Sequence, residues 1–166
     1  MNARTAPVKN EFPAIHDEKS RILILGSLPS EASRAAGFYY MNPRNRFWKM
    51  MSAILGCDLE AMSAEQKAAA LSEHGIALSD VILSCEIHRS SDASIKNVVC
   101  TDIPAILRGS RITKILLNGN KAYDLFLRYF PQYEPIARKM PSTSPANAKS
   151  KLKDLIEAWS AELKQQ

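Results

Sequence analysis

The amino-acid sequence predicts an α/β fold, a three-layer α/β/α sandwich around a central, mainly parallel four-stranded sheet. Short apolar runs rich in β-branched residues recur along the chain, as in strands that are buried on both faces of a parallel sheet. Amphipathic helical patterns separate these runs. Because strands that alternate with helices pair in parallel through right-handed crossovers, the helices are expected on both faces of the sheet.

The first strand is expected at residues 21–25, where RILIL ends in Gly26. Further apolar runs predict strands at residues 76–83 and 112–117, and a less regular one at residues 134–140. Ligands of such sheets bind beyond the carboxyl ends of the strands. The segments that follow these runs, GSLPS, SCEIHRSSD, NGN and PSTSPAN, are therefore where functional residues are expected.

Four helices are expected, over residues 47–55, 63–75, 122–129 and 152–163. Each of them carries apolar residues on one face at helical spacing. Gly56 closes the first helix. Ser63 and Gln66 have the spacing of a capping box at the start of the second.

Composition predicts one domain over residues 16–166 with a loose N-terminal arm at residues 1–15. The three cysteines are odd in number and widely spaced, so neither a disulfide framework nor a metal site is indicated, and no metal or cofactor is expected. No apolar stretch resembles a signal peptide or a membrane span, which predicts a soluble, cytoplasmic monomer. A net charge of +5 mildly favours polyanionic partners.

Three segments carry side chains suited to nucleic-acid chemistry. The first, residues 26–30, combines glycine and proline in a turn that can point backbone N–H groups into a crevice. The second, residues 37–48, holds five aromatics, two asparagines and two arginines, which suits stacking and reading an extruded base. The third, residues 140–147, has small hydroxyls and prolines ahead of a lysine-rich helix start, which suits binding phosphates.

Structural explanations exist for each segment as well. Glycine and proline after a strand are ordinary turn residues. Phe47 and Trp48 also fit the core face of the following helix, and residues 144–147 also fit a helix cap. Cys85 and His88 follow the second strand, but neighbours three residues apart seldom form a catalytic dyad.

Taken in register, GSLPS, YYMNPRNRFWK and MPSTSPAN resemble the uracil-DNA glycosylase superfamily, and within it most of all the hypoxanthine-DNA glycosylase branch. The similarity covers roughly residues 20–160. It implies a DNA glycosylase that acts on DNA containing a damaged base, hypoxanthine before uracil, and leaves an abasic site. The resemblance places the catalytic amide at Asn45 and the base-stacking ring at Tyr40. Leu28 stands where the mismatch-specific branch has a water-positioning asparagine.

The further site residues expected from the resemblance and the loop chemistry fall into two groups. The base-binding group comprises Gly26, Ser27, Leu28, Tyr40 and Phe47. The DNA-binding group comprises Pro29, Ser30, Pro141, Ser142, Thr143, Ser144, Asn147 and Lys149. Asn45 either orients the attacking water or stabilises the leaving base, with Ser27, Asp80 and Asp92 as substitutes if it does neither. A uracil or thymine mismatch glycosylase and a catalytically inactive DNA-binding relative remain the alternatives.

Overall fold

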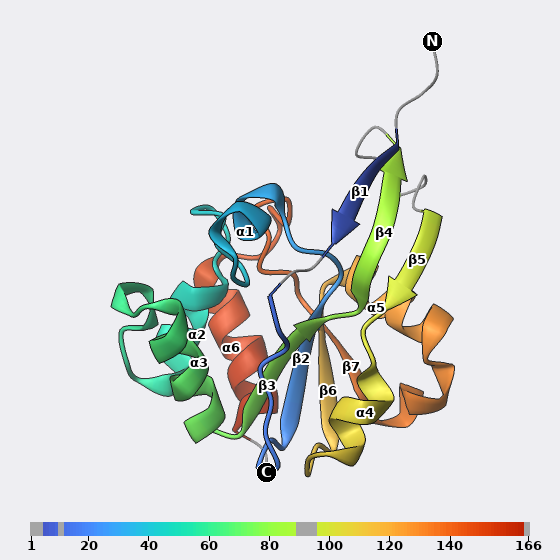
Figure 1. The fold of residues 1–166 in the computed structure, drawn as a ribbon. Coiled ribbons are helices and arrows are strands. Elements are labelled where there is room, and N and C mark those ends of the chain that lie inside the picture. Colours follow the sequence, from blue (N-terminus) through green and yellow to red (C-terminus); the bar gives the residue numbers. More distant parts are fainter. Residues whose placement is uncertain (1–4, 10–11, 89–95, 165–166) are drawn as a thin grey trace.

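The computed structural model describes residues 5–9, 12–88 and 96–164. Its centre is a four-stranded parallel sheet in the order β3-β2-β6-β7 (Figure 1). The strands are β2 (Ile22–Gly26), β3 (Ile76–Asp80), β6 (Lys114–Asn118) and β7 (Ala137–Met140). All neighbouring pairs are parallel, so the carboxyl ends of all four strands meet at one edge of the sheet.

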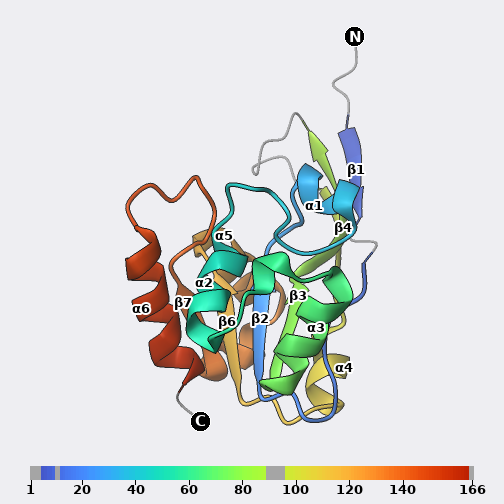
Figure 2. The ribbon, with the colours of Figure 1, turned by 90° about the vertical axis from the view of Figure 1, so that its left-hand side faces the viewer.

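Helices cover both faces of this sheet (Figures 1 and 2). One face is covered by α2 (Phe47–Leu55), α3 (Ala64–Glu73) and α6 (Leu152–Leu163). The other is covered by α4 (Ile103–Arg108) and α5 (Asn120–Tyr129). The short helix α1 (Glu31–Ala36) follows the first strand of the sheet. The predicted three-layer α/β/α architecture is thereby confirmed.

Alternation along the strands divides the core into two halves. In β2, Ile22 and Ile24 pack among α2, α3 and α6, including the fully buried Trp159. Leu23 and Leu25 point to the opposite face, against α4 and α5. Because successive side chains of a strand point to opposite faces, the apolar run RILIL supplies both halves of the core.

Two expected strands are bounded differently in the structure. The run at residues 76–83 divides at Val81, whose N–H donates to the Gly26 carbonyl at 2.8 Å while its carbonyl accepts from Thr101 N–H. The chain therefore leaves the parallel sheet there and continues as β4 (Ile82–His88). The strand expected at residues 134–140 is wrong over its first half, where Pro135 lies inside the 3₁₀ helix Pro131–Ile136, because proline cannot donate a ladder hydrogen bond.

A second, antiparallel sheet in the order β1-β4-β5 projects from the carboxyl edge of the first (Figure 1). It joins β1 (Thr5–Lys9), β4 and β5 (Lys96–Cys100). The loose arm expected at residues 1–15 is wrong for its described part, since residues 5–9 pair with β4 and Ile15 bridges to Leu78. Composition does not reveal this order because the pairing partners lie far along the chain.

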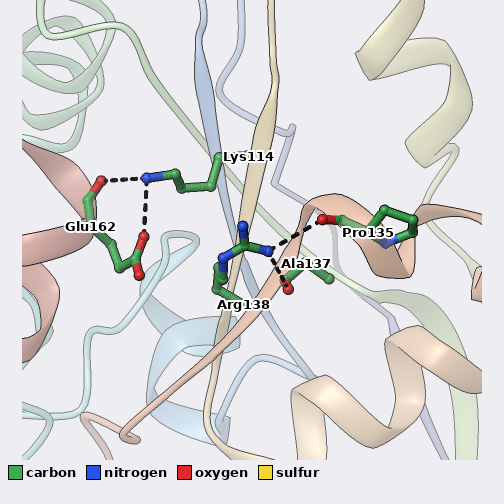
Figure 3. A network of polar contacts seen from close by, with 5 residues as sticks. All are labelled: Lys114, Pro135, Ala137, Arg138 and Glu162. Atoms are coloured by element: carbon green, nitrogen blue, oxygen red, sulfur yellow. Dashed lines mark hydrogen bonds and ion pairs between the residues drawn. The ribbon is translucent and has the colours of Figure 1, made fainter. Parts of the chain in front are cut away.

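At the opposite edge of the main sheet, a polar contact ties α6 to β6 (Figure 3). Lys114 Nζ donates to both the carbonyl and the carboxylate of Glu162, each at 3.0 Å. Arg138 lies nearby and donates to the carbonyls of Pro135 and Ala137. The start of β6 thus anchors the end of α6, far from the carboxyl edge. Across the part of the chain that is described, none of the helices has the length and apolar character needed to span a membrane.

Candidate active site

A pocket of about 200 Å³ lies at the carboxyl edge of the parallel sheet. It is lined by Gly26, Ser27, Leu28, Pro29, Ser30, Ser33, Tyr39, Tyr40, Asn45, Asp80, Asn118, Ser142, Thr143 and Ser144. The volume is below the roughly 300–1,000 Å³ of pockets for drug-sized ligands, as expected for a ligand about the size of one base. The ends of β2, β3 and β6 contribute Gly26, Asp80 and Asn118. Residues from all three expected segments, 26–30, 37–48 and 140–147, line the same pocket.

The floor of the pocket is formed where two side chains, those of Asp80 and Tyr40, converge on Gly26. A Cβ atom at this position would lie 2.5 Å from Asp80 Oδ1 and 2.8 Å from the Tyr40 hydroxyl oxygen. Such distances are shorter than real contacts, so only glycine allows both polar groups to approach the end of β2. Gly26, which the sequence indicates as a turn residue and a base-binding candidate, therefore creates the polar floor.

Asp80 ends β3 with only 2% of its surface exposed. Burial raises the pKa of the Asp80 carboxyl from 3.8 to about 7, because an apolar environment disfavours the charged form. On sequence grounds Asp80 is expected only as a substitute for Asn45. Its position after a fully buried strand is the signal that could have placed it in the site.

Tyr40 adopts a left-handed backbone conformation, with a φ of 54°. Its ring stacks on Phe47, with centroids 4.2 Å apart and planes 26° from parallel. The hydroxyl oxygen is buried and has no hydrogen-bond partner among the described residues. Burial, and then the nearby Asp80 charge, raise the pKa of Tyr40, and the neighbouring Asn118 amide partly opposes the rise. A non-glycine residue held in this conformation beside a pocket is typical of a functional site.

Phe47 does not line the pocket, so the direct base contact predicted for it is wrong in this structure. The ring is fully buried, and it packs edge-on against Trp48 and Trp159 as well as behind Tyr40. The core role that its helical spacing also allowed is the observed one. Phe47 acts on the pocket only by supporting the ring of Tyr40.

The orientation of the Asn45 amide follows from its neighbours. The backbone N–H of Phe47 donates to Asn45 Oδ1 at 3.0 Å, and the Thr143 hydroxyl donates to the same oxygen at 2.8 Å. Since a backbone N–H can only donate, the atom facing it must be the amide oxygen. Asn45 Nδ2 has no partner among the described residues, and the side chain lines the pocket. The amide therefore offers a hydrogen-bond donor to a ligand.

Asn118 and Thr143 hold Asn45 from behind. Thr143 N–H donates to Asn118 Oδ1, and Asn118 Nδ2 donates to the Thr143 hydroxyl, both at 3.0 Å. The Thr143 hydroxyl in turn donates to Asn45, so the three residues form a chain of hydrogen bonds. The bonds within such a chain polarise and strengthen one another. The sequence places Asn118 in the NGN segment after a strand but indicates no role for it.

Two hydroxyls expected on the DNA side are already engaged within the protein. Thr143 is fully buried behind the surface of the pocket that it helps to line, so its DNA contact stays a prediction. Ser30 caps α1 by accepting from Ser33 N–H at 3.1 Å, and its hydroxyl donates to Ser33 Oγ at 3.2 Å. Ser30 still lines the mouth of the pocket together with Pro29.

A wider groove of about 820 Å³ adjoins the pocket. Of the expected DNA-binding residues, Pro141, Ser142, Ser144, Asn147 and Lys149 line it. Gly119, Asn120 and Lys121, at the start of α5, line it as well. The Pro141 carbonyl accepts from Trp159 Nε1 at 3.0 Å, which fixes the entry of the loop against α6. The third segment thus lies beside the pocket with a positively charged wall.

The structure gives little support to a cysteine nucleophile or a metal centre among the described residues. Cys85 is 3% exposed, and burial raises the pKa of its thiol despite the nearby Lys121 and Arg34. Such a thiol is a poor nucleophile. Within residues 5–9, 12–88 and 96–164, no cluster of three or more His, Cys, Asp or Glu side chains could hold a metal ion. Asp92, the other carboxylate expected as a substitute for Asn45, lies outside the described residues, as does the side chain of His88.

Comparisons with known proteins agree with this arrangement. The model of the Uracil DNA glycosylase superfamily matches residues 12–164. A Hypoxanthine DNA glycosylase of Methanosarcina acetivorans is 35% identical over 148 residues, covering 84% of this chain and 89% of the relative. A second, of Methanosarcina barkeri, is 33% identical over 165 residues, covering 94% and 98%.

The fold is also shared with a solved structure. The solution NMR structure of a uracil DNA glycosylase candidate from Methanosarcina acetivorans superposes with a TM-score of 0.75 at 34% identity, covering 98% of this chain and 97% of the other. The family match spans every residue that lines the pocket. Because the family model matches most of the chain and these relatives share its sequence and fold, the chain belongs to the uracil DNA glycosylase superfamily.

Proposed function

We propose that this protein is a monofunctional DNA glycosylase that hydrolyses the N-glycosidic bond of hypoxanthine in DNA and leaves an abasic site. The observation that carries the proposal is the fixed Asn45 amide, which presents Nδ2 to a base-sized pocket at the carboxyl edge of the sheet. The relatives named as hypoxanthine DNA glycosylases support the choice of base, since they are similar over nearly the whole chain.

The lesion enters the pocket after it swings out of the helix, which costs a few kcal/mol and least for a weakly paired base. Tyr40 stacks on the extruded base through the ring face not covered by Phe47. The carboxyl of Asp80 then faces the edge of the base from the floor, so binding is favoured by polar edges.

In the chemical step the bond between C1′ and N9 breaks, and its electron pair leaves with the base. Asn45 Nδ2 donates to the negative charge that develops on the base, assisted by backbone N–H groups of Ser27 and Leu28. A preorganised donor of this kind can contribute about 3 kcal/mol to the transition state. Water adds to C1′ and loses a proton, and the departing base takes up a proton, so the reaction is a hydrolysis.

The amide orientation favours leaving-group stabilisation over the other role expected for Asn45. Both hydrogen bonds to its oxygen are made by Phe47 and Thr143, so that oxygen has little capacity left for holding water. Leu28 lines the pocket without any polar group to replace it. The attacking water is therefore bound elsewhere or arrives from solvent once the sugar has gained oxocarbenium character.

The DNA backbone lies along the adjoining groove. Ser142, Ser144 and Asn147 offer small polar groups, and Lys149 adds positive charge. Contacts of this kind position the duplex and carry no base information. The net charge of +5 also favours binding to DNA, which is a polyanion.

The test is a substrate panel under single-turnover conditions, with hypoxanthine, uracil, xanthine, alkylated bases and mispaired thymine in duplex DNA, and with the same bases in single-stranded DNA. Fastest excision of hypoxanthine, seen as strand cleavage after alkali, is the expected result. Faster excision of uracil, or of thymine in mispairs, would identify the protein as a uracil or thymine mismatch glycosylase instead. Binding of lesion DNA without any abasic product would mean that the protein is a catalytically inactive DNA-binding relative.

A further inference from the structure

Arg46 directly follows the proposed catalytic amide, and its side chain lies inside the loop that leads to α6. The acceptors are all backbone carbonyls of that loop: Nη2 donates to Ser144 at 2.9 Å and to Asn147 at 3.0 Å, Nε to Thr143 at 3.4 Å, and Nη1 to Ser150. The backbone N–H of Arg46 also donates to the Thr143 carbonyl, at 3.0 Å. One residue thus holds four carbonyls across residues 143–150.

This loop has little regular structure of its own. Residues 141–151 belong to no helix or strand, so their order depends on contacts with other elements. A guanidinium suits this task because its planar fork carries five N–H donors in fixed directions. Holding several residues in one conformation is costly in conformational entropy, which several simultaneous hydrogen bonds can offset.

Arg46 is also a cation without an acidic partner in the described part of the chain. The salt bridge found there joins Lys114 to Glu162, at the other edge of the sheet. Carbonyl dipoles solvate the guanidinium but do not neutralise it. Its charge therefore stays beneath a loop whose outer side lines the groove proposed for the DNA backbone.

We infer that Arg46 is a positioning residue that acts through Asn45 by holding Thr143 and the 143–150 loop in place. This inference rests on the proposed glycosylase function. The route is short: Arg46 fixes the Thr143 carbonyl, and the hydroxyl of the same residue holds the Asn45 amide oxygen. Because a misplacement of about 1 Å can cost about 10²-fold in rate, a loosened loop is expected to slow excision.

Arg46→Lys tests the inference because it keeps the charge and removes the planar fork. We expect single-turnover excision to fall by about 10-fold to 10²-fold, with a smaller loss of duplex affinity. Arg44→Lys is the matched control, since Arg44 is exposed and its side chain makes no hydrogen bond among the described residues. It should excise within about twofold of wild type, as surface substitutions have small effects.

A double-variant cycle separates positioning from general destabilisation. If Arg46 acts through Asn45, Arg46→Lys should lower the excision rate strongly in the wild-type protein and little in the Asn45→Ala variant. The reason is that the effects of residues that act as a unit are not additive. Equal slowing in both backgrounds would reduce Arg46 to a structural residue, and a wild-type rate for Arg46→Lys would remove it altogether. Arg46→Gln, which keeps amide donors, replaces the lysine variant if circular dichroism shows that the latter unfolds.

The same experiment distinguishes failure of the proposed function. If wild type excises another base of the panel instead of hypoxanthine, the cycle is run on that base and the inference about Arg46 stands or falls on it. If wild type excises none of the bases, both the proposed function and the positioning role are overturned.

Discussion

The Thr143 hydroxyl donates a 2.8 Å hydrogen bond to the amide oxygen of Asn45. Thr143 is fully buried, and it is held in turn by two hydrogen bonds with Asn118 at the end of β6. A strand of the central sheet therefore sets the direction of an amide in the aromatic segment through the final loop. The following predictions depend on this connection or on the pocket floor beside it.

Asn45→Ala should lower the rate of hypoxanthine excision by about 10²–10³ while leaving duplex affinity nearly intact, as loss of a preorganised donor does. Single-turnover excision and a gel-shift titration on the same duplex measure the two quantities. Asn45→Asp should not restore the rate, because a carboxylate cannot donate to a leaving anion. An equal fall in affinity and rate would instead make Asn45 a uniform binding residue.

Thr143→Val should slow excision by about tenfold or more and destabilise the protein by about 1–3 kcal/mol, because Asn118 Nδ2 loses its acceptor inside the protein. Thr143→Ser retains the hydroxyl and is the matched control, expected close to wild type in rate. Excision kinetics and urea unfolding of both variants check this. Equal rates for valine and serine would show that the hydroxyl does not act on Asn45.

Tyr40→Ala should weaken binding of the extruded base by about 1–3 kcal/mol, the range for a base stacked on an aromatic ring. Tyr40→Phe keeps the ring and removes a buried hydroxyl that has no partner among the described residues. The phenylalanine variant should therefore unfold at the same or a higher temperature than wild type, and it should lose less affinity for lesion DNA than Tyr40→Ala because it keeps the stacking ring. Binding titrations and thermal unfolding separate the ring from the hydroxyl, and an unchanged affinity for Tyr40→Ala would contradict the stacking role.

Asp80→Asn should stabilise the protein more at pH 8 than at pH 4. Burial raises the pKa of the Asp80 carboxyl from 3.8 to about 7, so between these values the folded protein holds a proton that the unfolded chain releases. The fold consequently loses up to roughly 1.4 kcal/mol per pH unit as pH rises through this window and then levels off. Urea unfolding of both proteins at several pH values measures the difference, and a gap independent of pH would show that Asp80 ionises normally.

Gly26→Ala should abolish the pocket floor even if the chain folds. The added methyl group would meet Asp80 Oδ1 at 2.5 Å and the Tyr40 hydroxyl at 2.8 Å, so one of them must move. We expect excision to fall at least as far as in Tyr40→Ala. Lys114→Ala is the comparison for stability alone, because its contact with Glu162 lies at the opposite edge of the sheet and is worth about 1 kcal/mol or less. Normal excision by Gly26→Ala would contradict the proposed floor.

Residue patterns along the chain were sufficient for the layers and for the segments that meet at the site. The alternation of apolar runs and amphipathic helices predicted the parallel sheet, since periodicity is local and reports which face of an element is buried. The edge where strands end is also a property of parallel connectivity, so GSLPS and PSTSPAN could be placed together from the sequence. The aromatic segment joined them only through the family resemblance, and its Asn45 and Tyr40 line the pocket.

Tertiary structure alone decided how the individual groups are used. Thr143 is buried and Phe47 stands behind Tyr40, although either could have faced DNA on sequence grounds. The direction of the Asn45 amide depends on a hydroxyl 98 residues away, and the raised pKa of Asp80 depends on the burial of its carboxyl. Hydrogen-bond direction and burial are properties of neighbours that fold together from distant parts of the chain, and local sequence carries no record of them.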